Sequence, residues 1–522
     1  MKTPAPRFPS LRSLGVVVAC LACNLVSVAD AAEPAVAPVA PVTAFTPEWE
    51  SLQRYECPEW FRDAKFGIWS HWGPQAVPGQ GDWYAREMYM EGEKAYAWHV
   101  ANYGHPSKFG YKDIIPLWKA ERFDPDALMA RYVKAGAKYF VTMGVHHDNF
   151  DLWKSKHHRW NAVEMGPKKD IVGLWAEAAR KHGLRFGVSE HLERAYNWFN
   201  TNKGADKTGP LAGVPYDGAD PKFAEFYFPP HDDTGYQYPK NAPEWWMAEW
   251  QRRILDLLDS YEPDVLFTDG GVPFGRYGRE LMAHYYNAGL KRHGGRQEVV
   301  YTVKRRTGGT HGEFVDGTAV ENLERGTMTA INPEPWQCDT TVADWFTSAD
   351  YKYKTAPEVI HLLCDVVSKN GNLLLNFTQY ADGTLEPKAS EILDELAAWM
   401  PVNGEAIFGT RPWRVFGEGP GQVAGGHFNE KNTKFDARDL RFTRKGDTLY
   451  AILLGWPGAG AEVEIAALAS EKWAGRVKNV TLLGHRSALE FTAGTTGLRV
   501  RLPASDAPTR HAVVLRIDAE NL

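Results

Sequence analysis

Polar and ionisable side chains recur at the ends of short apolar runs in this sequence. His71 follows FGIWS, His146 and His147 follow YFVTMGV, and Asp269 follows VLFT and precedes two glycines. A carboxylate at the end of a buried strand loses much of its hydration, so partners or a function should retain it. Asp269 is therefore the first candidate for a nucleophile or base, and the alternative is that it caps a helix or pairs with Arg276.

A second carboxyl group would complete the chemistry of glycosidic-bond cleavage. That reaction needs one ionised and one protonated carboxyl group flanking the scissile bond. Glu324 closes the run TAVENLE and stands directly before Arg325, with which it would otherwise form a surface pair. The candidates for the second group are Glu324, Glu321, Glu313, Glu190 and Asp82.

The histidines are better suited to binding hydroxyl groups than to binding a metal. Adjacent residues on a strand point to opposite sides, so His146 and His147 are poorly placed to share one ion. Neither this pair nor His157-His158 has the HxH or HExxH spacing of zinc sites. We therefore expect no metal and no other cofactor, and the alternative for these side chains is a structural role.

Aromatic residues are unusually frequent, with 20 Trp, 22 Tyr and 24 Phe in 522 residues. A polyhydroxylated ligand needs hydrogen-bonding groups for its hydroxyls and flat rings for its C–H faces. Trp83 and Trp336 are among the candidates for such rings. The net charge of −6, without a concentrated basic stretch, argues against nucleic acid as a partner.

Eight short apolar runs predict the strands that must position these groups. They are FGIWSHW (66–72), YFVTMGV (139–145), RFGVSEH (185–191), DVLFTDG (264–270), VVYTVK (299–304), TAVENLE (318–324), PWQCDT (335–340) and NLLLNF (372–377). Runs that are apolar on both faces are typical of buried parallel strands. Helices are predicted between several of them, at 124–136, 170–183, 244–260, 276–293, 356–369 and 387–400.

This pattern predicts a (β/α)8 barrel over residues 46–410, irregular after 304 and 324, where no good helix follows the strand. In such barrels the reactive groups stand at the carboxyl ends of the strands. Residues 411–522 alternate in short runs separated by Gly, Pro, Asn and Asp, which predicts an antiparallel β-sandwich with a structural role.

The amino terminus predicts export. Residues 1–32 combine basic residues, an apolar run and small residues around Ala29-Asp30-Ala31, as in a signal peptide, and 33–45 form a Pro/Ala-rich tether. We expect a secreted or periplasmic protein, with lipid anchoring through Cys20 as the alternative. No later stretch is apolar enough to span a bilayer. Cys57, Cys338 and Cys364 would remain, and no disulfide is required.

Several of these stretches, in this order, resemble the α-L-fucosidases of glycoside hydrolase family 29. The similar stretches are WFRDAKFGIWSHWGPQAVPG (60–79), DWY (82–84), KYFVTMGVHHDNFDLW (138–153), KKDIVGLW (168–175), DVLFTDGG (264–271), PWQCDTTV (335–342), SKNGNLLLNF with ADGTL (368–385) and NGEAIFGTRPW (403–413). The resemblance covers roughly residues 58–413. It implies an irregular (β/α)8 barrel followed by a β-sandwich.

The resemblance also implies roles for individual residues. Asp269 corresponds to the nucleophile, and Glu324 to the acid/base, with Glu321 as the reserve choice. His71, His146 and His147 are implied as ligands of the fucose hydroxyls, and Trp83 and Tyr84 as parts of the pocket rim. Lys304, with Arg305 as its alternative, aligns with a position that contacts the sugar or a carboxylate. Glu190, His191 and Trp336 are expected to contact substrate because of their places in the strand pattern.

Three positions depart from the family pattern. Phe267 stands where many members have Trp, Glu190-His191 replaces a Tyr-rich stretch, and Lys304 stands where Arg is expected.

The function that this resemblance implies is retaining hydrolysis of terminal α-L-fucosyl residues on fucosylated glycans. Within the enzyme class, an α-L-galactosidase or a member active on sulfated fucans is the alternative, because apolar pockets discriminate modestly against an added hydroxyl. Outside it, the alternatives are a catalytically lapsed carbohydrate-binding protein and a metal-dependent hydrolase.

Overall fold

The structure is a computed structural model that describes residues 43–305, 312–430 and 434–522. The expected signal peptide (1–32), Cys20 and all but the last three residues of the expected tether (33–45) lie outside the described residues and stay predictions. Among the helices of the described ranges, none has both the length and the apolar composition needed to cross a bilayer.

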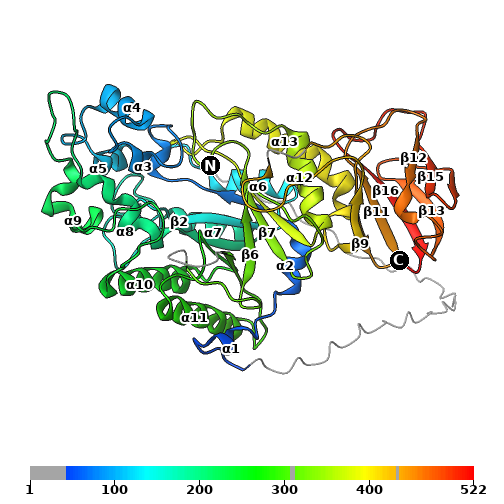
Figure 1. The fold of residues 1–522 in the computed structure, drawn as a ribbon, viewed down its shortest axis with the longest axis horizontal. Coiled ribbons are helices and arrows are strands. Elements are labelled where there is room, and N and C mark those ends of the chain that lie inside the picture. Colours follow the sequence, from blue (N-terminus) through cyan, green and yellow to red (C-terminus); the bar gives the residue numbers. More distant parts are fainter. Residues whose placement is uncertain (1–42, 306–311, 431–433) are drawn as a thin grey trace, which may run out of the picture. The chain divides into compact units, whose positions relative to one another are not determined.

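Eight parallel strands close into a barrel in which each strand pairs with the next along the chain and β8 returns to β1 (Figure 1). They are β1 (Phe66–Ser70), β2 (Tyr139–Val145), β3 (Arg185–Glu190), β4 (Val265–Thr268), β5 (Val300–Lys304), β6 (Val320–Glu324), β7 (Trp336–Thr341) and β8 (Gly371–Asn376). Each strand overlaps one of the eight predicted runs: six lie wholly within their run, and β7 and β8 are each displaced from theirs by one residue. In six of the eight strands every residue is buried, which is why continuous apolar runs located them.

Helices follow the strands where helical patterns were predicted, at α6 (Pro125–Lys134), α7 (Ile171–Lys181), α10 (Glu244–Tyr261), α11 (Arg276–Arg292), α12 (Ala356–Ser368) and α13 (Pro387–Asn403). Asp124 and Asp170 cap α6 and α7 by accepting hydrogen bonds from backbone N–H groups in the first turn, at 3.0 and 2.9 Å. Between β5 and β7 the described residues form no helix, so the predicted irregularity is confirmed.

Short helices fill the loops on the barrel. They are α1 (Trp49–Leu52), α2 (Glu59–Ala64), α3 (Tyr84–Glu87), α4 (Lys94–Tyr103), α5 (Tyr111–Ile114), α8 (Ala195–Trp198) and α9 (Ala224–Tyr227). The long β1–α6 connection therefore carries three helices, α3 to α5, and the β3–β4 connection carries α8 and α9 ahead of α10. These two connections supply several of the side chains described below.

The C-terminal part forms two antiparallel sheets, as predicted. One has five strands in the order β13-β16-β11-β10-β9, and the other has three in the order β12-β15-β14. The strands are β9 (Arg411–Glu418), β10 (Leu440–Lys445), β11 (Thr448–Leu453), β12 (Glu462–Ile465), β13 (Arg476–Leu482), β14 (Phe491–Ala493), β15 (Leu498–Arg501) and β16 (Val513–Glu520). Trp413, Phe442 and Leu515 belong to the apolar core of this part.

A buried ion-pair network joins the barrel to the five-stranded sheet. Asp365 on α12 accepts hydrogen bonds from Nε of Arg441 on β10 at 2.6 Å and from Nζ of Lys369 at 2.7 Å. All three side chains are at most 3% exposed. Because a buried charge is stable only when it is paired, this network fixes one domain against the other.

Candidate active site

A cavity of about 620 Å³ opens at the carboxyl ends of the barrel strands. Polar lining residues lie within two positions of the carboxyl end of six strands: His71 after β1, His147 after β2, His191 after β3, Asp269 after β4, Glu324 at the end of β6 and Asp339 in β7. The others are Trp69, Gln80, Gly81, Asp82, Trp83, Glu87, Arg194, Tyr236, Gln237, Asp344, Trp345 and Phe428.

The turn after Asp269 depends on glycine. A Cβ atom added to Gly270 would lie 1.0 Å from the hydroxyl oxygen of Tyr238, and one added to Gly271 would lie 2.8 Å from the backbone of Gly312. Both distances are shorter than any van der Waals contact. The two glycines therefore let the chain leave β4 sharply, with the carboxylate of Asp269 at the cavity.

Lys304 links the two carboxylates that the sequence singled out. Its buried ammonium nitrogen donates hydrogen bonds to Oδ1 of Asp269 and to Oε2 of Glu324, the second at 2.5 Å. Two oxygen atoms that accept from one ammonium lie within about 6 Å of each other, because an N···O hydrogen bond is about 3 Å long. This limit is shorter than the ~6.5–9.5 Å that separates the carboxyl groups of inverting glycosidases.

The surroundings of Asp269 keep its carboxylate ionised. Burial alone would raise its pKa, but the ammonium of Lys304 and then the guanidinium of Arg194 outweigh burial and hold the pKa well below its usual range. Arg194 Nη1 lies 3.6 Å from Oδ2 of Asp269, and Nη2 donates to the Asp269 carbonyl at 3.0 Å. Asp269 is therefore an anion throughout the neutral and mildly acidic pH range.

Strand alternation separates Glu324 from Glu321. Val320, Asn322 and Glu324 share one face of β6, and the side chain of Asn322 donates at 2.5 Å to Asp339, which lines the cavity. Glu321 is on the opposite face, where Nε of Arg305 lies 3.3 Å from its carboxylate. Of the two candidates, only Glu324 lines the cavity.

A third carboxyl group stands beside Glu324. Asp339 is the register partner of Glu324 across β6 and β7 and is 1% exposed. Burial raises the pKa of Asp339 to about 7; the ammonium of Lys304 opposes the rise and Glu324 adds to it. A proton is consequently held next to Glu324 at mildly acidic pH.

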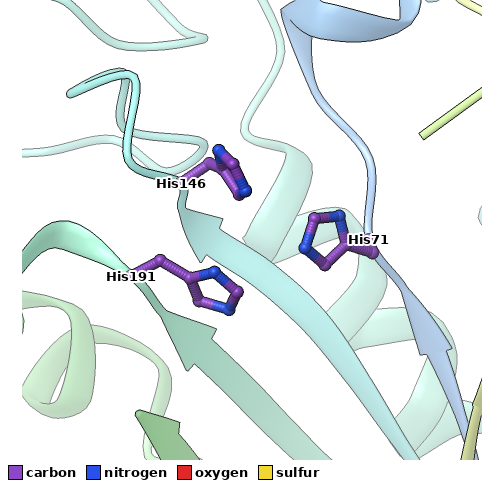
Figure 2. A group of neighbouring side chains, drawn as sticks. All are labelled: His71, His146 and His191. Atoms are coloured by element: carbon purple, nitrogen blue, oxygen red, sulfur yellow. The ribbon is translucent and has the colours of Figure 1, made fainter. Parts of the chain in front are cut away.

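Figure 2 shows His71, His146 and His191 grouped at the ends of β1, β2 and β3, with their rings in one neighbourhood. The side-chain amide of Gln75 donates to Nδ1 of His146 at 2.9 Å, which leaves Nε2 to face Oδ1 of Asp82 at 3.2 Å. His146 thus lies behind Asp82 and outside the cavity lining, whereas His71 and His191 line it.

His147 is oriented by its neighbour. Its Nδ1 donates to the carbonyl oxygen of His191 at 2.7 Å, so Nε2 points toward the cavity, 3.4 Å from Oδ2 of Asp269. In a neutral imidazole this Nε2 is an acceptor for a hydroxyl proton. Nδ1 of His71 and Nε2 of His191 have no hydrogen-bond partner within the part of the chain that the structure describes, and each can bond a ligand.

Burial keeps these imidazoles neutral. It lowers the pKa of His71 to about 3, with Asp82 opposing, and that of His147 to about 4, with His146 adding to the fall. It lowers the pKa of His191 well below the usual value. Nitrogen atoms of His71, His146 and His191 lie within 4.8 Å of one another, a spacing that also suits a metal ion.

Aromatic rings form the apolar parts of the cavity. The indole of Trp69 contacts the rings of Phe267 and Trp345, with centroid separations of 5.2 Å in both cases. Trp83 and Tyr236 form a second pair with centroids 5.6 Å apart. Rings on two sides and polar groups between them suit a ligand with both C–H faces and hydroxyls.

Five residues expected to contact substrate are absent from the cavity lining: His146, described above, and Glu190, Tyr84, Trp336 and Lys304. Glu190 follows Ser189, which faces the barrel interior, so its carboxylate points outward and accepts hydrogen bonds from Thr268 at 2.6 Å and from Trp250 of α10 at 3.1 Å. It supports the barrel wall.

Tyr84 and Trp336 are also placed elsewhere. Tyr84 bonds His99 of α4 at 2.5 Å and is fully buried, while the preceding Trp83 lines the cavity. Trp336 begins β7, at the opposite end of the barrel, and donates to the carbonyl of Lys369 at 2.9 Å. Lys304 lies below the cavity lining and contacts the carboxylates.

The sequence did not single out several cavity residues. Arg194 follows β3 by four positions, within the loop where a strand-end pattern ends, and Asp339 lies inside a strand. Phe428 comes from the connection between β9 and β10, in the part expected to be structural. The local sequence does not indicate that a residue of the C-terminal part reaches the mouth of the barrel.

Comparisons with known proteins agree with this geometry. Residues 35–405 match the sequence model of the family described as alpha-L-fucosidase, and residues 433–518 match that of the alpha-L-fucosidase C-terminal domain. The human plasma alpha-L-fucosidase is 30% identical over 88% of this chain and 89% of its own length. The rat tissue alpha-L-fucosidase is 28% identical over 91% and 93%.

A solved structure shows the same architecture. A Thermotoga maritima alpha-fucosidase in complex with a mechanism-based inhibitor superimposes with a TM-score of 0.69, at 26% identity, over 91% of this chain and all of the other. The match of the family model to most of the chain, the closed barrel and the paired carboxylates lead to one assignment. This chain belongs to the α-L-fucosidase family of glycoside hydrolases, family 29.

Proposed function

We propose that this enzyme hydrolyses terminal α-L-fucosyl residues with retention of configuration, with Asp269 as nucleophile and Glu324 as acid/base. The observation that carries the proposal is the placement of both carboxylates on the one ammonium group of Lys304, at the cavity. This spacing leaves room for the anomeric carbon between the two carboxyl groups. It leaves too little room for the additional water molecule that an inverting mechanism requires.

The proposed reaction has two steps. In the first, a carboxylate oxygen of Asp269 forms a bond to the anomeric carbon while the glycosidic bond breaks and Glu324 transfers its proton to the leaving oxygen. In the second, Glu324 removes a proton from water, the water oxygen bonds to the anomeric carbon, and the bond to Asp269 breaks. Fucose is released, and both carboxyl groups return to their starting states.

The neutral histidines and aromatic rings support binding of the sugar. Imidazoles that carry one donor and one acceptor suit hydroxyl groups, which need both. His71, His147 and His191 offer such groups beside Asp269, and His146 holds Asp82 in the lining. Trp69 and Trp345 form a dry wall that suits the methyl group of fucose. We include Trp83, at the rim, among the sugar contacts.

The first residues of the chain support a location outside the cytoplasm. We propose that residues 1–32 direct export, so that the enzyme acts on fucosylated glycans outside the cytoplasm, in secreted, periplasmic or Cys20-anchored form.

Substitution of the nucleophile tests the mechanism. Asp269→Gly should lower kcat/KM on an aryl α-L-fucoside by at least about 10³-fold, since the covalent route is then closed, while NMR of the wild-type reaction shows α-L-fucose as the first product. Glu313→Gln is the matched control, because Glu313 lies outside the cavity and pairs with Arg279 at 3.0 Å. β-L-fucose as first product, or an active Asp269→Gly variant that is folded, would reject the proposal.

A further inference from the structure

Phe428 combines three unusual properties. Its side chain is 56% exposed, the largest exposed fraction among the large hydrophobic residues of the described chain. Its backbone adopts a φ of +60°, a region that side-chain-bearing residues rarely occupy. It also lines the cavity. Exposure of an apolar ring and a left-handed backbone are both unfavourable, and such features gather where a ligand makes use of them.

The segment that presents Phe428 is firmly held. Residues 424–430 belong to the connection between β9 and β10 and run antiparallel to the residues that follow β6. The backbone N–H of Gly426 donates to Thr327 at 3.0 Å, and that of Phe428 donates to the carbonyl of Glu324 at 2.9 Å. A Cβ on Gly326 would lie 2.0 Å from the Gly426 carbonyl, so glycine permits this close approach.

Glu430 anchors the far end of the segment. Its carboxylate, 3% exposed, pairs with Nε of Arg325 at 2.9 Å and with Nζ of Lys354 at 2.8 Å, and accepts a hydrogen bond from Thr340 at 2.6 Å. Its backbone N–H donates to the carbonyl of Arg325 at 3.1 Å. A buried, multiply bonded carboxylate fixes the segment on the barrel, so the position of the Phe428 ring is set in advance.

The same segment contacts the proposed acid/base. The backbone N–H of Glu324 donates to Nδ1 of His427 at 3.0 Å, and its carbonyl accepts from Phe428. The leaving oxygen must be within hydrogen-bonding distance of the Glu324 carboxyl group to take its proton. Whatever is attached to that oxygen therefore lies on the Glu324 side of the cavity mouth, which is the side where Phe428 is exposed.

We propose that Phe428 is the platform of a leaving-group subsite, supplied by the C-terminal part of the chain, which binds the flat face of the ring released with the glycosidic oxygen. The ligand class is a pyranose of the glycan or an aryl group, both of which present an apolar face to an aromatic ring. This inference rests on the proposed function, because it takes Glu324 as the acid.

Three substrates that differ only in the leaving group test the subsite. They are α-L-fucosyl fluoride, which has no ring in its leaving group, 4-nitrophenyl α-L-fucoside, and a fucosylated lactose. Phe428→Ala should lower kcat/KM roughly 3- to 10-fold on the two substrates with rings and less than about 2-fold on the fluoride, since one aromatic contact contributes that much. Phe428→Trp, which keeps an aromatic ring, should retain wild-type kcat/KM on both substrates whose leaving group contains a ring.

Two further variants sharpen the comparison. Trp245→Ala removes another exposed aromatic, 49% exposed and outside the cavity, and should leave all three substrates unchanged. Tyr236→Ala removes the other strongly exposed ring of the cavity lining, which belongs to the pair with Trp83. If Tyr236→Ala rather than Phe428→Ala lowers kcat/KM only on the substrates whose leaving group contains a ring, the assignment of the subsite to Phe428 is wrong.

The outcomes separate this inference from the proposed function. A wild-type enzyme that releases fucose from none of the three substrates overturns both. An active wild type whose Phe428→Ala variant loses equally on all three, or on none, overturns the subsite alone. Thermal unfolding of Phe428→Ala should match the wild type because the ring is exposed, and Phe428→Leu, which keeps apolar volume without a flat face, should show the same ring-dependent loss.

Discussion

Lys304 sets the charge of Asp269, the proposed nucleophile, from a buried position. Its ammonium opposes the effect of burial on Asp269 and, with Arg194, holds the pKa of that carboxyl well below its usual range. Because the folded-state pKa lies below the unfolded value of about 3.9, the contact stabilises the folded chain above about pH 4 and the stabilisation is lost as the pH falls below it. The low pKa therefore keeps the Asp269 carboxylate ionised at neutral and mildly acidic pH.

Removal of this positive charge should move the acid limb of the activity profile. In the Lys304→Met variant, only Arg194 remains as the main positive charge that opposes burial, so the pKa of Asp269 should rise. As the pH is lowered, kcat/KM of this variant should therefore begin to fall at a pH at least about one unit higher than in the wild type. Lys304→Arg, which keeps the charge, is the matched control and should retain the wild-type limb. The measurement is kcat/KM on an aryl fucoside from pH 3.5 to about 8; coincident acid limbs for wild type and Lys304→Met would contradict the assignment.

The acid/base assignment is tested by the two glutamates of β6. Glu324→Ala should lower the rate by about 10²- to 10⁴-fold on a natural glycan, whose leaving group needs a proton, and far less on an aryl fucoside with a good leaving group. Added azide should raise the activity of this variant, because a small anion can replace water without a base. Glu321→Ala, on the opposite face of the strand, should show neither effect; if it does, the roles are exchanged.

At the scale of elements, the sequence located all eight barrel strands and the six long helices that follow the barrel pattern. Buried parallel strands are apolar on both faces, and that property is visible in a single sequence. The face on which each residue points is less visible. Glu190 and Asp269 both stand at the end of an apolar run, but Glu190 is still within β3 and faces outward, whereas Asp269 follows β4 and faces the cavity.

Strand boundaries account for a second misplaced contact. Trp336 was expected at the cavity because its run was counted among the eight that meet there, but it is the first residue of β7. A strand of six residues extends about 20 Å, so its first and last residues are at opposite ends of the barrel. Asp339, three positions later, is the β7 residue that reaches the cavity.

The link between α12 and β10 gives a prediction at this scale. Asp365→Asn leaves the guanidinium of Arg441 and the ammonium of Lys369 buried with one charge fewer between them, which should destabilise the chain by about 3 kcal/mol or more. The midpoint of thermal unfolding at a fixed heating rate measures the effect.

An exposed ion pair provides the matched control for Asp365. Lys388 and Glu391 pair on α13 with side chains 65% and 63% exposed, so Glu391→Gln should change stability by less than about 0.5 kcal/mol. Equal midpoints for the Asp365→Asn and Glu391→Gln variants would show that the buried network does not join the domains energetically.

At the scale of the whole molecule, the sequence predicted two structural parts and assigned the chemistry to the first. The fold is as expected, and Asp269, Glu324, His71, His147, His191 and Trp83 do line one cavity. The contribution of Phe428 could not be predicted, because it depends on a contact between residues about one hundred positions apart. Contacts of that kind arise from how domains pack, and one sequence carries no local trace of them.

The connection between β9 and β10 leaves one sheet, reaches the barrel opening through residues 424–430 and returns to the same sheet. Its two ends are fixed in a scaffold that takes no part in the barrel. The exposed ring at position 428 can therefore be exchanged without changing β4 and β5, the strands that precede Asp269 and end in Lys304. Under the proposed subsite, selectivity for the leaving group is encoded in the C-terminal part, in a segment that also contacts the backbone of Glu324.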